Sequence, residues 1–122
     1  MCSLHNNKGF TLLEILIAMV ILSIGLLGMA VLTGGIMRGN TFSNELTTAT
    51  TLAQDRMEDI KRAGYSGASS LTENYNEISN FPLHKRVTNV VDGPASGMRT
   101  VTVTVYWDSD AHSIVLKTIL AE

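Results

Sequence analysis

The sequence predicts an α+β fold in which one long N-terminal helix packs on a small antiparallel sheet of about three strands. Three observations lead to this prediction. Residues 15–37 form a run of 23 without a formal charge. Apolar residues then recur at helical spacing as far as Ile60. Finally, valines alternate with threonines between Val101 and Val105, which is typical of a strand with one buried face.

The composition of the 122-residue chain argues against several classes of protein. Hydrophobic residues make up 45% and charged residues 16%, and the apolar excess lies near the N-terminus. A formal net charge of −2 provides no basic field to collect nucleic acid. The single cysteine, Cys2, cannot form an intramolecular disulfide. Intrinsic disorder, a disulfide scaffold and a stand-alone nucleic-acid binder are therefore disfavoured.

The uncharged run at residues 15–37 is long enough to cross a membrane. As a helix with a rise of about 1.5 Å per residue, it spans about 35 Å, against about 30 Å for a bilayer core. A domain of this size cannot bury such a helix on all sides. The run also exceeds the roughly 7–15 apolar residues of a cleaved secretory signal. We therefore expect a retained transmembrane helix, with its N-terminus in the cytoplasm and the larger part of the chain outside.

One acidic residue, Glu14, stands directly before the uncharged run. An acid at the centre of a membrane helix costs about 2.5–3.5 kcal/mol on insertion scales, and less near an end. Glu14 can be interpreted as an interfacial residue that marks the helix start, with Thr11 as a cap. Alternatively, Glu14 pairs with a cation from outside the run, because no Lys or Arg lies within the run to supply one.

The residues around Glu14 resemble the processing signal of type IV prepilins. Residues 8–14 read KGFTLLE and precede the apolar run. The resemblance implies that prepilin peptidase cleaves between Gly9 and Phe10, removes residues 1–9 as a leader and N-methylates Phe10. It also implies that Glu14 pairs with the N-terminal amine of a neighbouring subunit during assembly.

The long helix is expected to have two halves. Residues 10–38 form a transmembrane half, which the resemblance also places in a filament core, and residues 39–63 form an amphipathic half. Gly25 and Gly28 either weaken the first half or let another helix approach closely. Gly64 is expected to end the helix. The apolar face of the second half consists of Phe42, Leu46, Ala49, Ala53, Met57 and Ile60.

Residues 64–122 are expected to form the small sheet head. Residues 64–83 are polar and rich in turn formers, so they are predicted as a connecting loop. Strands are predicted at residues 85–91, 98–107 and 112–120. Turns at residues 92–94 and 108–110 separate these strands.

No catalytic or metal-binding motif stands out, so we predict that the chain is not an enzyme and needs no cofactor or metal. His5, His84 and His112 lack the spacing of zinc ligands. Asp108 and Asp110 are interpreted as turn residues, because the glycine and the distal glutamate of a calcium loop are missing.

A small DNA-contacting patch is a further hypothesis, although the acidic net charge leads us to expect no nucleic-acid partner. Its candidate residues are Lys85, Arg86 and Arg99, together with Tyr106 or Trp107.

Two further stretches are similar to PilV-type minor pilins, which are type IV pilus modification proteins. These stretches are residues 21–30, ILSIGLLGMA, and residues 50–60, TTLAQDRMEDI. The chain lacks the C-terminal cysteine pair usual in major pilins, which favours a scarce tip or priming subunit. The resemblance therefore implies a minor pilin that acts in pilus assembly, initiation or modification.

The resemblance also implies partners and a location. The partners are prepilin peptidase, other major and minor pilin subunits, and the inner-membrane assembly platform. Before assembly, the chain crosses the inner membrane once with its head in the periplasm, and afterwards it lies in the pilus at the cell surface. Two alternatives stay open: a minor pseudopilin of a type II secretion system, and a signal-anchored single-pass membrane protein that binds a partner.

Overall fold

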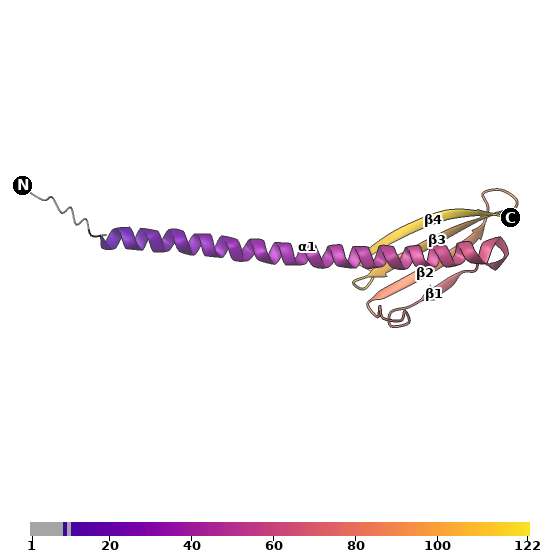
Figure 1. The fold of residues 1–122 in the computed structure, drawn as a ribbon, viewed down its shortest axis with the longest axis horizontal. Helices are drawn as coiled ribbons and strands as arrows, with labels where there is room; N and C mark the ends of the chain where they lie inside the picture. Colours follow the sequence, from indigo (N-terminus) through magenta and orange to yellow (C-terminus); the bar gives the residue numbers. More distant parts are fainter. Residues whose placement is uncertain (1–8, 10) are drawn as a thin grey trace, which may run out of the picture. The chain divides into compact units, whose positions relative to one another are not determined.

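The computed structural model describes Gly9 and residues 11–122. The described residues up to Asn40 form one compact unit and residues 41–122 form a second, and the long helix contributes to both. The predicted α+β class, a long N-terminal helix packed on a small antiparallel sheet, is confirmed. The elements in chain order are α1 (Leu12–Gly67), β1 (Leu71–Glu73), β2 (His84–Asp92), β3 (Met98–Trp107) and β4 (His112–Ala121) (Figure 1).

The sheet has four antiparallel strands in the order β1-β2-β3-β4, rather than about three. The three predicted strands are present, with ends that differ by at most one residue. The additional strand, β1, lies within residues 64–83 and pairs Leu71 with Thr88 and Glu73 with Arg86. Three residues are too few to establish an alternating pattern, so β1 is visible only through its pairing with β2.

Helix α1 changes direction at Gly64 before it ends at Gly67. Gly64 has φ 73° and ψ −172°, a combination that essentially only glycine adopts. Gly67 is also constrained, because a Cβ there would lie 2.9 Å from the Ala63 Cβ. The expected end at Gly64 is therefore a kink, followed by one further short turn.

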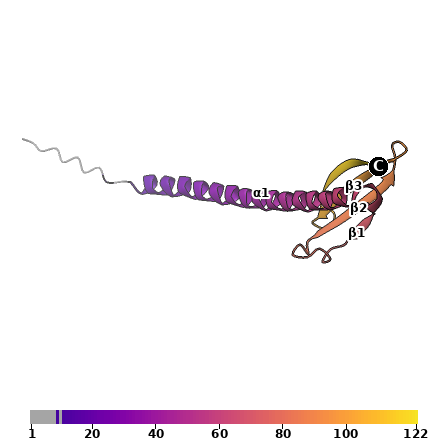
Figure 2. The ribbon, with the colours of Figure 1, turned by 45° about the vertical axis from the view of Figure 1, so that its right-hand side comes forward.

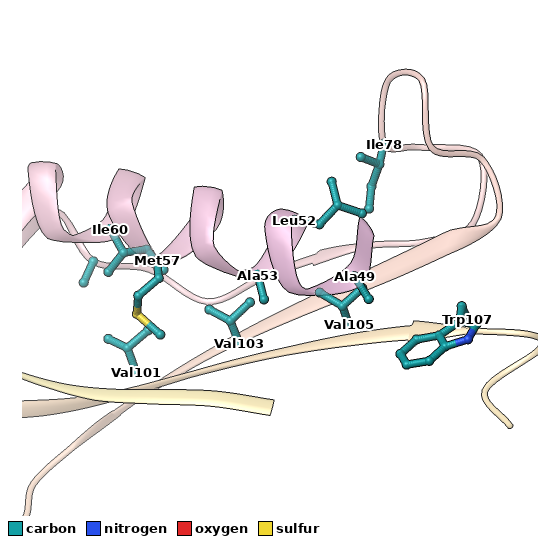
Figure 3. Packing of buried hydrophobic residues seen from close by; sticks show 11 residues of the cluster. Ala49, Leu52, Ala53, Met57, Ile60, Ile78, Val101, Val103, Val105 and Trp107 are labelled. Atoms are coloured by element: carbon teal, nitrogen blue, oxygen red, sulfur yellow. The ribbon is translucent and has the colours of Figure 1, made fainter. Parts of the chain in front are cut away.

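The core of the second unit lies between α1 and β3. Ala49 and Ala53 are fully buried on the helix, and their small side chains let the helix approach the sheet closely. Figure 3 shows this helix face opposite the valines of β3. The buried apolar cluster consists of Ala49, Leu52, Ala53, Met57, Ile60, Ala68, Ile78, Val101, Val103, Val105 and Trp107.

The predicted apolar face of the helix is partly wrong at its beginning. Phe42 and Leu46 are exposed, at 45% and 38%, whereas Leu52 is buried at 4%. The Phe42 ring still lies 6.2 Å from the ring of Trp107 and 5.2 Å from that of His112. The helix thus meets the sheet fully only from Ala49 onward, and a spacing pattern cannot reveal where a sheet begins to cover a helix.

Arginine side chains join α1 to the sheet. The Arg86 guanidinium donates to the Leu52 carbonyl oxygen at 3.1 Å and to the Glu73 carboxylate at 2.8 Å. The hydrogen bond from Arg86 lowers the pKa of Glu73, against the opposing effect of burial. Arg99 donates to the Tyr65 carbonyl oxygen at 2.6 Å. In the turned view of Figure 2, the C-terminal part of α1 again lies across the sheet.

Candidate membrane and assembly segment

The start of α1 is capped by Thr11. The Thr11 Oγ1 accepts a hydrogen bond from the Glu14 backbone N–H at 3.2 Å, and its carbonyl oxygen accepts one from the Ile15 N–H at 3.2 Å. This geometry agrees with the interpretation of Thr11 as the cap, and the order Thr-x-x-Glu is that of a capping box. Glu14 lies in the first turn, where a negative charge is favourable to the helix dipole.

The carboxylate of Glu14 extends from an exposed position. Among the described residues, none forms a hydrogen bond or an ion pair with this carboxylate. The capping interaction and a pairing of the Glu14 carboxylate with a cation are therefore compatible. The cap uses the backbone N–H of Glu14, and its side-chain oxygens remain available to a partner.

The helix after Glu14 presents apolar side chains on every side. All described residues from 11 to 40 are exposed, and the large apolar side chains expose from 46% at Ile15 to 77% at Val31. The most apolar window has a mean hydropathy of 2.8 and is 0% buried. In the part of the chain that the structure describes, α1 is the one helix long and apolar enough to cross a membrane. An apolar surface of this extent requires lipid or other proteins to cover it.

Hydroxyl groups on this segment are satisfied within the helix. The Ser23 Oγ donates to the Met19 carbonyl oxygen at 2.7 Å, and the Thr33 Oγ1 donates to the Met29 carbonyl oxygen at 2.9 Å. Hydroxyls that bond back to the preceding turn leave no free donor to face hydrocarbon. No role for Ser23 or Thr33 was predicted from the sequence, although a Ser or Thr inside an apolar helix is the signal that reveals such a bond.

Gly25 and Gly28 lie on the exposed helix, three residues apart. A Cβ built at either position meets nothing within 4 Å among the described residues. Packing inside this chain therefore does not explain these glycines, and their role in helix approach stays a prediction. The proposed leader also stays a prediction: Gly9 is exposed, whereas residues 1–8 and Phe10 lie outside the described residues.

The hypothetical DNA patch does not form one surface. Lys85 lies opposite Tyr106 in the register, whereas Arg86 pairs with Val105 on the face that α1 covers. Both arginines are also engaged: Arg86 with Glu73, and Arg99 with Asp92 at 2.9 Å. Alternation along β2 has placed neighbouring cations on opposite faces of the sheet.

Lys85 and Asp110 instead join the start of β2 to the turn between β3 and β4. The Lys85 Nζ lies 2.8 Å from the Asp110 Oδ2, and the Tyr75 hydroxyl donates to the Asp110 Oδ1 at 2.9 Å. The hydrogen bond with Lys85 lowers the pKa of Asp110, and the same bond raises the pKa of Lys85. Asp108 and Asp110 both have positive φ, of 54° and 68°, as expected for residues of a tight turn.

Two of the histidines lie on either side of Trp107 in the sheet, because His84 pairs with Trp107 on one side and His112 pairs with it on the other, whereas His5 lies outside the described residues. His84 is 5% exposed, and its Nε2 lies 3.1 Å from the Glu45 Oε2. The His112 ring stacks near Trp107 at 5.6 Å. Within the described residues, no group of three His, Cys, Asp or Glu side chains is placed to hold a metal ion.

Comparison with known proteins concerns the N-terminal segment. Residues 4–30 match the family model of the prokaryotic N-terminal methylation motif. No significant match to the chain was found among curated proteins or solved structures. The matched range includes the proposed cleavage site, Glu14, Gly25 and Gly28. This motif is found on prepilins of the pilin and pseudopilin type, which are structural subunits and substrates of prepilin peptidase. The chain therefore carries a prepilin-like N-terminus.

Proposed function

We propose that the chain is a minor pilin of a type IV pilus, made as a membrane-anchored precursor and then incorporated into the filament or its initiating complex. One observation carries the proposal: the methylation motif at residues 4–30 coincides with a helix whose apolar surface no described residue covers. In a filament subunit, such a helix would anchor the precursor in the membrane before assembly and pack against other subunits afterwards.

Residues 10–38 would then have two successive environments. In the precursor, lipid covers the exposed side chains of the helix. In the filament, the helices of neighbouring subunits cover them, because this much apolar surface is unfavourable in water. The proposed subunit thus exchanges one apolar environment for another.

Cleavage would create the cation that Glu14 lacks. Hydrolysis of the Gly9–Phe10 peptide bond adds OH to the Gly9 carbonyl and leaves an ammonium group on Phe10, and N-methylation retains its charge. Two unit charges about 4 Å apart attract by about 4 kcal/mol at an effective dielectric constant of about 20. Desolvation offsets much of this attraction. Pairing with a neighbouring subunit would therefore mainly set the register of assembly.

Mass spectrometry of the chain from membranes and from sheared pili tests this processing. We expect both samples to contain a chain that begins at N-methylated Phe10. A chain that keeps residues 1–9 in both fractions would refute the proposal and favour a signal-anchored membrane protein. A processed chain found with a type II secretion apparatus and missing from pili would identify a pseudopilin instead.

The substitution Glu14→Gln tests the proposed charge pair. The variant should still insert into the membrane and be cleaved, because the apolar run is unchanged, but its recovery in sheared pili should fall at least tenfold. Glu58→Gln, on the exposed face of the second unit, is the matched control and should assemble normally. Equal incorporation of the two variants would remove the assembly role assigned to Glu14.

A further inference from the structure

The apolar face of α1 begins before the sheet covers it. Phe42 is 45% exposed and Leu46 is 38% exposed, whereas Ala49, further along the helix, is fully buried. The Phe42 ring nevertheless lies against the end of the sheet, because it is 5.2 Å from the His112 ring. The helix therefore carries two partly covered apolar side chains between the uncharged run and the point where the sheet buries it.

The strand register brings three more rings to this end of the sheet. His84 at the start of β2 pairs with Trp107 at the end of β3, which in turn pairs with His112 at the start of β4. The His84 Nε2 lies 3.1 Å from the Glu45 Oε2 on α1. In Figure 3, Trp107 lies at the Ala49 end of the packed helix face. One end of the sheet is therefore level with the first turns of α1 in the second unit.

The segment before β2 adds exposed apolar side chains at the same end. Leu83 directly precedes His84 and is 68% exposed. Phe81 is 36% exposed, and its ring lies 6.3 Å from the His84 ring. Apolar side chains scattered singly on a surface are ordinary, whereas a group of them marks a contact surface. We call this group the entry end, because the chain enters the second unit here; it consists of Phe42, Leu46, Phe81 and Leu83.

The distance along the chain brings the entry end to the surface of a bilayer. Phe42 follows Met37, the last residue of the uncharged run, by five residues. Five residues span about 7.5 Å as a helix and at most about 18 Å when fully extended. Helix side chains also tilt toward the N-terminus, which is the direction of the run. A headgroup layer is about 5–7 Å thick on each side of the hydrocarbon core. With residues 15–37 in the membrane, the Phe42 ring therefore reaches the headgroup layer.

We propose that the entry end is a membrane-contact surface that docks the second unit on the phospholipid headgroups of the bilayer that holds residues 15–37. Its apolar and aromatic side chains would partition into the boundary between headgroups and hydrocarbon. Lys85 at this end is already paired with Asp110 at 2.8 Å, so the contact is apolar and should persist in high salt. The proposal rests on the membrane anchor of the proposed function, and not on cleavage or on incorporation into a pilus.

Fluorescence quenching in vesicles tests this contact. The full, uncleaved chain with Cys2→Ser is reconstituted in phosphatidylcholine vesicles that contain a lipid with a spin label on its headgroup. An environment-sensitive dye is attached at Leu83→Cys or, as the control, at Val91→Cys. Val91 is also exposed, at 54%, and lies eight residues further along, about 26 Å away in an extended strand. We expect quenching at position 83 to be at least about twofold stronger than at position 91.

Removal of apolar side chains from the entry end separates contact from mere proximity. Phe42→Ser/Phe81→Ser should reduce the quenching of a dye at position 83 by at least about twofold, because serine gains little from the boundary region. Leu71→Ser/Val115→Ser, at positions 43% and 58% exposed elsewhere on the second unit, is the matched control and should leave the quenching unchanged. Thermal melting followed at Trp107 shows that both variants are folded.

Flotation of the chain with the vesicles shows that it is anchored. In the floated chain, equal quenching at positions 83 and 91 would overturn the proposal, and so would unchanged quenching of the Phe42→Ser/Phe81→Ser variant. Cross-linking of two chains through Leu83→Cys without quenching by lipid would assign the entry end to a second copy and also overturn it. A chain that does not float would overturn the membrane anchor together with this contact, so the two failures are distinct.

Discussion

Residues 11–40 and residues 41–122 contain the same apolar residue types but differ in whether these side chains are buried. Ile24 is 66% exposed, whereas Ile60 is 2% exposed. Val20 is 58% exposed, whereas Val103 is fully buried. The first segment is apolar on all sides and therefore has no face to turn toward a sheet. The second half of α1 is apolar on one face, and that face packs on β3. The periodicity of the apolar residues, more than their number, determines whether this chain covers them itself.

The largest effect is expected from a charge in the core of the second unit. Val103→Asp should destabilise the head by at least about 4 kcal/mol, because an unpaired carboxylate would be buried between α1 and β3. This is a large part of the stability of a typical domain. Trp107, the single tryptophan and 3% exposed, reports the loss by fluorescence. Val115→Asp, at a position 58% exposed, is the matched control, and equal melting of the two variants would contradict the packing described.

A charge in the first segment should have a smaller effect, on membrane insertion and not on the folding of the head. Leu22→Arg, at a position 63% exposed, should disfavour membrane insertion by about 2.5–3.5 kcal/mol and leave the melting of the head unchanged. Extraction of membranes with alkaline carbonate measures the bound fraction. Leu83→Arg, at an exposed leucine of the second unit (68%), should remain fully in the membrane fraction. If both variants stay equally bound, residues 15–37 do not anchor the chain.

Glycine substitutions in the two units should affect stability in opposite directions. Gly64→Ala should destabilise the head by about 1–3 kcal/mol, because alanine is strained at φ 73°. Gly34→Ala should stabilise the first half of α1 by about 0.5–1 kcal/mol, because its added Cβ meets nothing within 4 Å. Thermal melting followed at Trp107 should change only for Gly64→Ala. A change of equal size in both variants would show that the two segments unfold together.

The smallest effect is expected from the ion pair between Glu73 and Arg86. A carboxyl whose pKa is lowered in the folded state adds stability above its ordinary value of 4.5, and this contribution disappears as the pH falls through the lowered pKa. At neutral pH, Glu73→Gln should therefore melt at a lower temperature than the unmodified chain. Its free energy of unfolding should be lower by less than about 1 kcal/mol. The difference should shrink below about pH 4.5. Glu58→Gln is the exposed control, and a pH-independent difference for Glu73→Gln would contradict this origin.

The sequence alone predicted the features that depend on local patterns. An uncharged run identifies a helix that cannot be covered within so small a chain, and alternation from Val101 to Val105 identifies the central strand. Thr11 marks the cap through its side-chain oxygen, and Gly64 marks the interruption of the helix through its backbone freedom, although the sequence predicted an end there and the structure has a kink. The candidate site around Glu14 could be proposed from the sequence alone, because its residues are contiguous and their chemistry does not depend on the rest of the fold. The roles assigned to Gly9, Phe10 and Glu14 stay predictions.

Only the tertiary structure decided which distant residues meet. Strand β1 is defined by its pairing with β2, and Arg86 is oriented by the Leu52 carbonyl oxygen and by Glu73, neither of which is near it in sequence. The same holds for Arg99, whose guanidinium donates to the Tyr65 carbonyl oxygen on the helix. Short strands and single polar contacts have little local preference of their own, so their positions follow from the register of the sheet and the packing of α1 upon it.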